Sequence, residues 1–192
     1  EDGKVTVTRA AAKVTYPARF MLVAAMNPCK CGYFGDPKRK CKCSPDSGAK
    51  YLARVSGPLL DRIDIEIELP SISYDELAKK RGTGEPSREI RKRVNAARRF
   101  TNERLARAGD KTGVLNANMT PEMMRKHCEL DEEASTLMRR AFDALGLSAR
   151  GYDRVLRVAR TVADLDGDER INADHIAEAI TFRSLDRKYW KK

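Results

Sequence analysis

The 192-residue sequence lacks any apolar run close to the roughly 18 residues that a membrane-spanning helix needs. It also lacks the basic and apolar segments of a secretory signal peptide at its start. We therefore expect a cytoplasmic protein that does not act in a membrane. No Met begins the chain, and the sequence at Glu1 is typical of the middle of a domain. For this reason we expect the chain to be a fragment of a longer protein.

A phosphate-binding loop is also missing, because no G-x-x-x-x-G-K-[ST] string occurs. The nearest string, at residues 109–112 (GDKT), has neither the Gly-Lys pair nor the upstream glycine. No apolar strand ends in the Asp-Glu pair that could hold a magnesium ion. The chain alone is therefore not expected to hydrolyse ATP.

Positive charge is in excess: 38 Lys and Arg stand against 28 Asp and Glu, a net charge of +10. This excess favours a polyanionic partner such as nucleic acid or a nucleotide. An ordinary solvated basic surface is the alternative. A hydrophobic content of 41% is sufficient for a core.

Four of the five cysteines lie within 15 residues, as two C-x-C pairs separated by nine residues. In a cytosolic protein such a cluster favours metal binding over disulfides. Their loop, residues 27–50, has too few apolar side chains to order itself, and a tetrahedral zinc site would supply the missing folding energy. C-x-C is less diagnostic than C-x-x-C, so unligated thiols and a redox role stay open. The four candidate ligands are Cys29, Cys31, Cys41 and Cys43; the fifth, Cys128 beside His127, is interpreted as a small buried residue.

Alternating or apolar segments in the first 70 residues predict β-structure. We expect a hairpin from residues 4–8 and 13–16, a buried strand at 20–26, a short helix at 52–60 interrupted by Gly57 and Pro58, and a half-buried strand at 63–69. The composition then changes, and a domain boundary is placed near residue 71, with a linker or early helix at 71–86.

The remainder, residues 71–192, predicts a helical bundle. A basic helix is expected at 87–105, with Ile90, Val94, Ala97 and Phe100 or Leu105 along one side and a solvated or subunit-contacting basic face. Four further helices are expected after capping residues, and Gly146 and Gly167 are expected to end two of them. The capping residues are Thr120, Asp131, Ser148 and Asn172, and the last helix is expected to turn Ile176, Ala177 and Ile180 inward. The fold class is thus α+β and mostly α.

Three segments, residues 25–33 (AMNPCKCGY), 54–64 (RVSGPLLDRID) and 148–161 (SARGYDRVLRVART), resemble the magnesium-chelatase-like AAA+ ATPases of the ComM/YifB group. The resemblance covers nearly the whole chain. It implies that residues 1–70 are the C-terminal half of an αβα AAA+ core and residues 71–192 its helical lid. It also implies that the full-length protein is a homo-oligomeric ring, a hexamer, that uses ATP and Mg²⁺, with the phosphate-binding loop upstream of Glu1.

By this resemblance three residues have roles in ATP hydrolysis. Asn27 matches sensor 1, which positions the attacking water, and Arg62 matches the arginine finger, which reaches a neighbouring subunit's nucleotide. Arg150 matches sensor 2, and a cation at a helix start is unfavourable unless an anion joins it. The alternatives are that Asn27 only forms a turn, and that Arg62 forms a surface ion pair with its acidic neighbours.

The resemblance also identifies the hairpin of residues 4–16 with the hairpin that precedes sensor 1. In related ring helicases this hairpin contacts nucleic acid, so Arg9 and Lys13 at its tip are candidate contacts to DNA phosphates, with ordinary solubilising charges as the alternative. The implied function is a competence or branch-migration type ATPase that remodels or translocates DNA. A magnesium chelatase subunit is the close alternative, disfavoured by the inserted cysteine loop. A non-catalytic, zinc-stabilised nucleic-acid-binding module is the alternative from another class.

Overall fold

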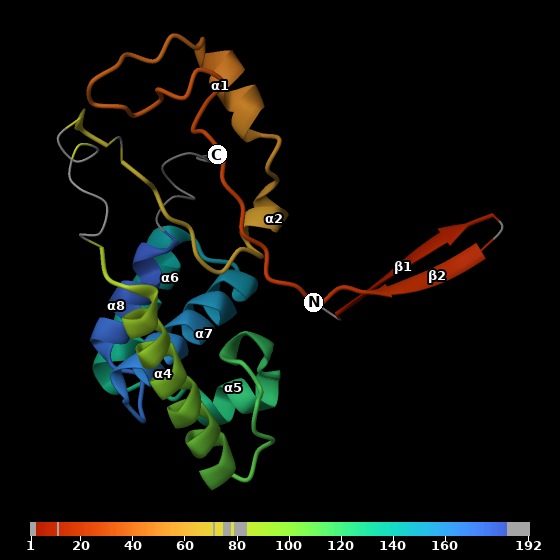
Figure 1. Ribbon diagram of the computed structural model, residues 1–192, viewed down its shortest axis with the longest axis vertical. Coiled ribbons are helices and arrows are strands. Elements are labelled where there is room, and N and C mark those ends of the chain that lie inside the picture. Colours follow the sequence, from red (N-terminus) through yellow and green to blue (C-terminus); the bar gives the residue numbers. More distant parts are fainter. Residues whose placement is uncertain (1–2, 11, 71, 75–77, 79–83, 184–192) are drawn as a thin grey trace.

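The computed structural model describes residues 3–10, 12–70, 72–74, 78 and 84–183, and shows a helical bundle, a loop-rich N-terminal part and a projecting hairpin (Figure 1). Helices predominate among these residues, with one two-stranded sheet. The mostly helical α+β fold class is confirmed. The boundary near residue 71 stays a prediction, and most of the segment 71–86 lies outside the described residues.

The predicted hairpin is confirmed as β1 (Lys4–Arg9) paired antiparallel with β2 (Ala12–Pro17). The register places Lys4 opposite Pro17, and the hydroxyls of Thr6 and Thr15 meet across the strands at 2.9 Å. The described residues of both strands are exposed, and the hairpin extends away from the rest of the molecule (Figure 1). A hairpin with two solvated faces is only marginally stable by itself.

Two predicted strands, at residues 20–26 and 63–69, are wrong. Neither pairs with a strand among the described residues. Their apolar side chains are largely exposed: Met21 is 87% exposed, Val23 81% and Leu69 86%. A strand needs a neighbouring strand for its backbone hydrogen bonds, and no such ladder forms here among the described residues. The Glu66 N–H instead donates to the Phe182 carbonyl, at 3.0 Å.

The helix predicted at residues 52–60 is also wrong in its bounds. The structure has two helices, α1 (Pro45–Leu52) and α2 (Gly57–Leu60), so α1 takes up part of the predicted loop. Pro58 begins a helix rather than interrupting one, because a first-turn residue has no intrahelical partner for the N–H that proline lacks.

The four predicted helix starts are confirmed. In each, the side chain of the capping residue accepts a hydrogen bond from a backbone N–H three residues later. Gly146 and Gly167 end two helices with φ of 58° and 80°, a left-handed conformation that suits glycine. The bundle comprises α4 (Ser87–Arg107), the 3₁₀ helix η1 (Asn116–Asn118), α5 (Pro121–His127), α6 (Glu132–Leu145), α7 (Ala149–Asp166) and α8 (Ala173–Thr181).

The core forms around α7, which packs against α4, η1 and α8. Two expectations about inward residues are wrong. Ala177 is exposed while Ala179 is buried, and on α4 Ile90 and Val94 are exposed whereas Leu105 is fully buried. The C-terminal half of α4 therefore contributes its fully buried apolar side chain. Fully buried core residues include Ala134, Val155, Ala159, Ala163, Ile171 and Ile176.

A buried ionic network connects α4, η1 and α7. The Asp164 carboxylate accepts hydrogen bonds from the Arg104 guanidinium at 3.1 Å and from Arg160 Nε at 3.1 Å. It also accepts from the Asn116 amide at 2.7 Å and the Thr101 hydroxyl at 2.8 Å. Burial lowers the pKa of Arg160, and the nearby Asp164 charge opposes that shift. The sequence patterns did not predict this network, because amphipathic spacing assigns charged residues to the surface.

Removal of the shared charge should be strongly destabilising. Asp164→Asn leaves two buried arginines without a counter-ion, and we expect a loss of about 3–5 kcal/mol in the free energy of unfolding, measured by urea denaturation. Glu169→Gln removes the carboxylate of the exposed Arg107–Glu169 pair and serves as the control, with an expected loss of about 0–1 kcal/mol. Equal losses in the two variants would contradict this account of the network.

Candidate functional site

The four clustered cysteines are brought together in space. Their sulfur atoms all lie within 4.8 Å of one another. The Sγ atom of Cys31 is 3.4 Å from that of Cys29 and 3.5 Å from that of Cys41. All are free thiols; Cys29 is buried and the other three are half-buried. Four sulfurs bound to a tetrahedral zinc ion at about 2.3 Å would be about 3.8 Å apart, so the group could hold such a metal ion.

Local turns produce this convergence. Gly32, with φ of 80°, donates its N–H to the Cys29 carbonyl at 3.0 Å and closes a turn that contains the first two thiols. The Asp36 carboxylate then accepts from the backbone N–H groups of Lys38 and Arg39, at 2.7 and 2.9 Å, in a second turn. The chain therefore returns Cys41 to the first pair.

The backbone also favours the metal-binding form of one thiol. Hydrogen bonds from the backbone at Tyr33 and Lys42 lower the pKa of Cys31 to about 6. The thiolate is the form of cysteine that binds metal. In contrast, burial raises the pKa of Cys128 to about 11, in agreement with the interpretation of that residue as a small buried one.

Arg62 lies directly after α2, with an exposed side chain whose Nη1 donates to the Pro58 carbonyl at 2.6 Å. Its acidic neighbours have partners on the helical bundle. Asp61 accepts from the Ser148 hydroxyl at 3.1 Å, and Asp64 accepts from Arg154 Nη1 at 2.6 Å. The turn that carries Arg62 is thus attached to the first part of α7.

A buried arginine makes further contacts with the turn that carries Arg62. Arg183, 2% exposed, donates from Nη1 to the carbonyls of Leu60 and Ile63, and its Nη2 lies 3.7 Å from the Asp61 carboxylate. Sequence pattern alone does not predict a role for Arg183, because a lone arginine after a helix cannot be distinguished from a solvated one.

Arg150 is the second residue of α7 and is exposed, two positions after the capping Ser148. Because Ser148 bonds to Asp61, the backbones that carry Arg150 and Arg62 lie next to each other. Asn27 is exposed at the end of the extended segment that leads to Cys29. Among the contacts of the described residues, none joins Asn27 to either arginine. The structure therefore brings two of the three predicted residues together.

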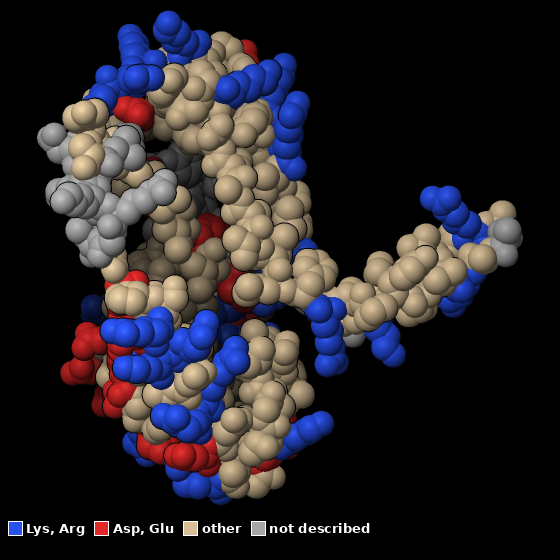
Figure 2. All heavy atoms as spheres, in the orientation of Figure 1, with Lys and Arg blue, Asp and Glu red and all other residues tan. Residues whose placement is uncertain are grey.

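Arg9 and Lys13 lie at the outer end of the hairpin, where Arg9 is opposite Ala12 and Lys13 is opposite Thr8. Both are exposed. Basic side chains surround this end of the hairpin in Figure 2, well away from the helical bundle. Among the described residues, no helix has the length and apolar character to cross a membrane.

Comparison with known proteins gives a family for both parts of the chain. Residues 1–77 match the family model of magnesium chelatase, subunit ChlI, and residues 84–183 match the model of its C-terminal part. The chain belongs to the magnesium chelatase-like family. The predicted resemblance is thereby confirmed at the family level.

Relatives of this magnesium chelatase-like chain include the competence protein ComM of Haemophilus influenzae, 37% identical over 187 residues, and YifB of Escherichia coli, 40% identical over 188 residues. A protein of Mycobacterium tuberculosis is 37% identical over 183 residues. The alignments cover 95–97% of this chain. The chain spans 35% of the length of each relative.

The contacts of Arg183 with the Arg62 turn, which we call the Arg183 clamp, can be tested by replacing Arg183. Arg183→Ala leaves the carbonyls of Leu60 and Ile63 without this donor, and hydrogen bonds to a charged group contribute about 1.5–3 kcal/mol each. We expect backbone amides at residues 60–64 to exchange with deuterium at least tenfold faster, measured by mass spectrometry. The exposed Arg170→Ala should leave that exchange unchanged. Unaltered exchange at 60–64 in Arg183→Ala, with α7 still protected, would contradict the clamp.

Proposed function

We propose that this chain is the nucleotide-responding part of a ring-forming AAA+ ATPase that couples ATP hydrolysis to remodelling or translocation of DNA. One observation carries the proposal: in a magnesium chelatase-like chain, Asp61 and Ser148 hold the Arg62 turn against the N-terminus of α7, where Arg150 lies. Two exposed guanidinium groups on adjacent backbones suit a polyphosphate ligand.

The N-terminus of α7 adds to the attraction for an anion. Backbone N–H groups of a helix start carry partial positive charge, and Arg150 increases it. The Asp61 carboxylate, which accepts from the capping Ser148, offsets part of this positive charge. A phosphate group near Arg150 would stabilise the helix and the arginine further.

Each residue has one task in this proposal. Bound ATP with Mg²⁺ would supply the phosphoryl group that is transferred. Arg62 would stabilise the negative charge that develops on a neighbouring subunit's nucleotide, and Arg150 would bind phosphate oxygens. Asn27, presented by the segment before the cysteine loop, would orient the attacking water. Because Arg62 and Arg150 start from adjacent backbones, we assign them to the same nucleotide.

The DNA partner is supported by the charge and by the hairpin. The net charge is +10, and the projecting hairpin presents Arg9 and Lys13 in exposed positions. The H. influenzae relative is named for competence. A magnesium chelatase ATPase subunit is the second candidate, favoured by the name of the matching family model. The cysteine loop between Asn27 and Arg62 favours the ComM/YifB type.

We also assign a structural Zn²⁺ to Cys29, Cys31, Cys41 and Cys43. The sulfur separations suit tetrahedral coordination. The loop contributes little to any apolar core, since Cys29 and Leu52 are the buried hydrophobic residues described between 27 and 52. A metal ion would provide the folding energy that this segment does not obtain from packing.

The role of Arg62 is tested in the full-length protein. Arg62→Ala should reduce ATP turnover by about a thousandfold, the lower range for loss of an arginine finger, while nucleotide binding persists. Arg91→Ala, at an exposed position on α4, is the control and should keep its turnover. A mixture of Arg62→Ala with a variant that cannot bind ATP should regain activity, because each supplies what the other lacks. Unchanged turnover in Arg62→Ala would exclude the role.

The metal assignment is tested by elemental analysis of the purified chain. We expect about one equivalent of zinc per chain. Cys41→Ser should lower the zinc content and expose residues 29–43 to proteolysis, because three thiolates and a hydroxyl hold the ion poorly. Cys128→Ala should retain the zinc. Metal-free protein in which the loop resists proteolysis would overturn the assignment.

A further inference from the structure

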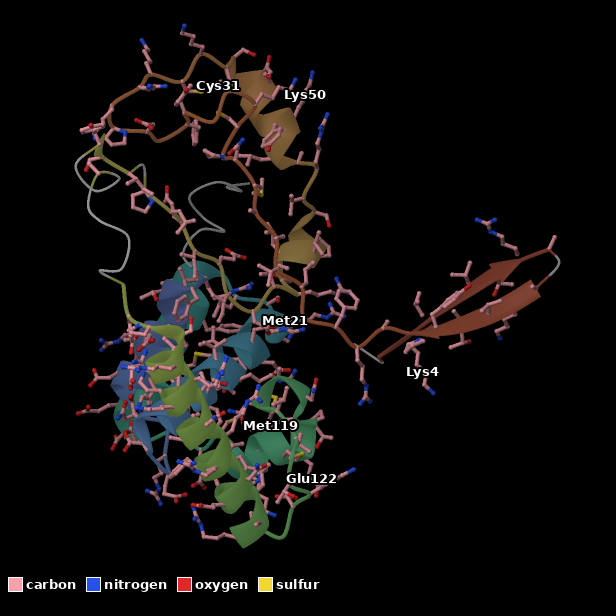
Figure 3. All side chains as sticks on the ribbon, viewed as in Figure 1. Lys4, Met21, Cys31, Lys50, Met119 and Glu122 are labelled. Carbon is pink, nitrogen blue, oxygen red and sulfur yellow. The ribbon has the colours of Figure 1, made fainter. Side chains whose placement is uncertain are left out.

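The cysteine loop and α1 together, residues 29–54, form what we call the cysteine lobe. Figure 3 places Cys31 and Lys50 at the same end of the molecule, away from the helical bundle. The lobe contains seven Lys and Arg and two Asp. All seven cations are exposed: Lys30, Lys38, Arg39, Lys40, Lys42, Lys50 and Arg54.

Positive charge is concentrated in the cysteine lobe. The lobe is about one seventh of the chain, yet its net charge of +5, with neutral thiols, is half of the chain's +10. Four thiolates around one Zn²⁺ would contribute −2 and leave the lobe at +3. Figure 2 shows basic side chains on both flanks of this end of the molecule, with few acidic ones between them. Such a surface attracts a polyanion.

One of the two acids in the lobe has a structural role. Asp36 accepts hydrogen bonds from the backbone N–H groups of Lys38 and Arg39 and stabilises the turn. Lys30 and Lys42 each stand between two cysteines of a C-x-C pair. A metal ion that fixes the thiols therefore also fixes the backbone that carries these two lysines.

Aromatic side chains accompany the cations. Arg39 donates to the Tyr33 hydroxyl at 2.8 Å, and its guanidinium carbon lies 5.2 Å from the centre of the Tyr33 ring. These contacts orient Arg39 toward a fixed position on the lobe. Phe34, the next residue, is 47% exposed. Exposed aromatic rings beside basic groups are the arrangement on which unpaired bases stack.

We propose that the cysteine lobe binds single-stranded DNA, with lysines on the phosphates and Phe34 under a base. The proposal deepens the proposed function and rests on its metal assignment for the order of the loop. Binding tolerates any sequence, because phosphate contacts and stacking read no base edges. It provides a second DNA contact, distinct from the hairpin tip.

The test measures binding of a fluorescent oligothymidylate of about 20 nucleotides to the 192-residue chain by anisotropy, over a range of salt concentrations. The lobe variant combines three substitutions, Lys38→Gln, Lys40→Gln and Lys50→Gln, and should weaken binding at least tenfold. It should also reduce the slope of log affinity against log salt by about 2, because three phosphate contacts on a single strand contribute about 0.7 each. Phe34→Ala should weaken binding about tenfold and leave the salt slope unchanged.

Matched controls separate the lobe from the rest of the charge. Arg91→Gln, Arg98→Gln and Arg99→Gln remove the same charge from exposed positions on α4 and should leave binding within twofold. The double variant Arg9→Gln with Lys13→Gln measures how much the hairpin contributes to binding of the oligonucleotide. Equal loss in the α4 and lobe variants would overturn the proposal. So would a wild-type chain that binds anionic vesicles or an acidic protein but not the oligonucleotide.

Zinc content distinguishes failure of this proposal from failure of the metal assignment. The lobe variant should retain about one zinc per chain, because no ligand has been changed. If it keeps its zinc and still binds the oligonucleotide as the wild type does, the DNA proposal is wrong and the metal assignment stands. If the wild-type chain holds no zinc and the lobe variant still binds the oligonucleotide more weakly than the wild type, the metal assignment fails and the DNA surface stands.

Discussion

The helical bundle depends on one buried carboxylate. Asp164 pairs with Arg104 from α4 and with Arg160 from its own helix, and it also accepts from Asn116 of η1. Three elements, with residues up to 60 positions apart in sequence, thereby share one centre. Apolar packing around α7 would tolerate some sliding of helices, whereas charge pairing and hydrogen bonding at this centre require a defined position. The orientation of α7, on which the candidate nucleotide site depends, follows from this constraint.

The N-terminal end of α7 attaches the N-terminal part of the chain to the bundle. Ser148 and Arg154 bond to Asp61 and Asp64, the two carboxylates on either side of Arg62. Arg183 completes the attachment through backbone carbonyls. A motif that looks like a surface loop in sequence is thus held by three side chains of the helical part. The position of Arg62 is therefore coupled to that of the helical bundle.

The sequence predicted the parts of the fold that depend on local chemistry. The hairpin, the four helix caps and the two glycine ends follow from interactions within a few residues, and the structure confirms them. The cysteine spacing likewise predicted four thiols within ligand distance of one ion. The sequence did not predict the long-range contacts, because the Asp164 network and the Arg183 clamp join charged residues that periodicity assigns to solvent.

The two wrong strands, at 20–26 and 63–69, have a different cause. Their apolar patterns are typical of buried strands, but a strand also requires a neighbour, and sequence pattern does not say whether the same chain supplies one. Among the predicted site residues, Asn27 follows the first of these segments, Arg62 precedes the second, and Arg150 lies on α7. Their joint geometry therefore depended on tertiary contacts that no motif specifies.

The Arg183 clamp also determines an order of events during synthesis. Arg183 and its acceptors at Leu60 and Ile63 are separated by 123 and 120 residues. The Arg62 turn leaves the ribosome long before its clamp has been translated, and it cannot be fixed until the helices of the bundle have been made. Contacts of such long range close late and slowly, because the chain between them must first lose much of its freedom. The Arg62 turn therefore reaches its final position only after the chain up to Arg183 has been made.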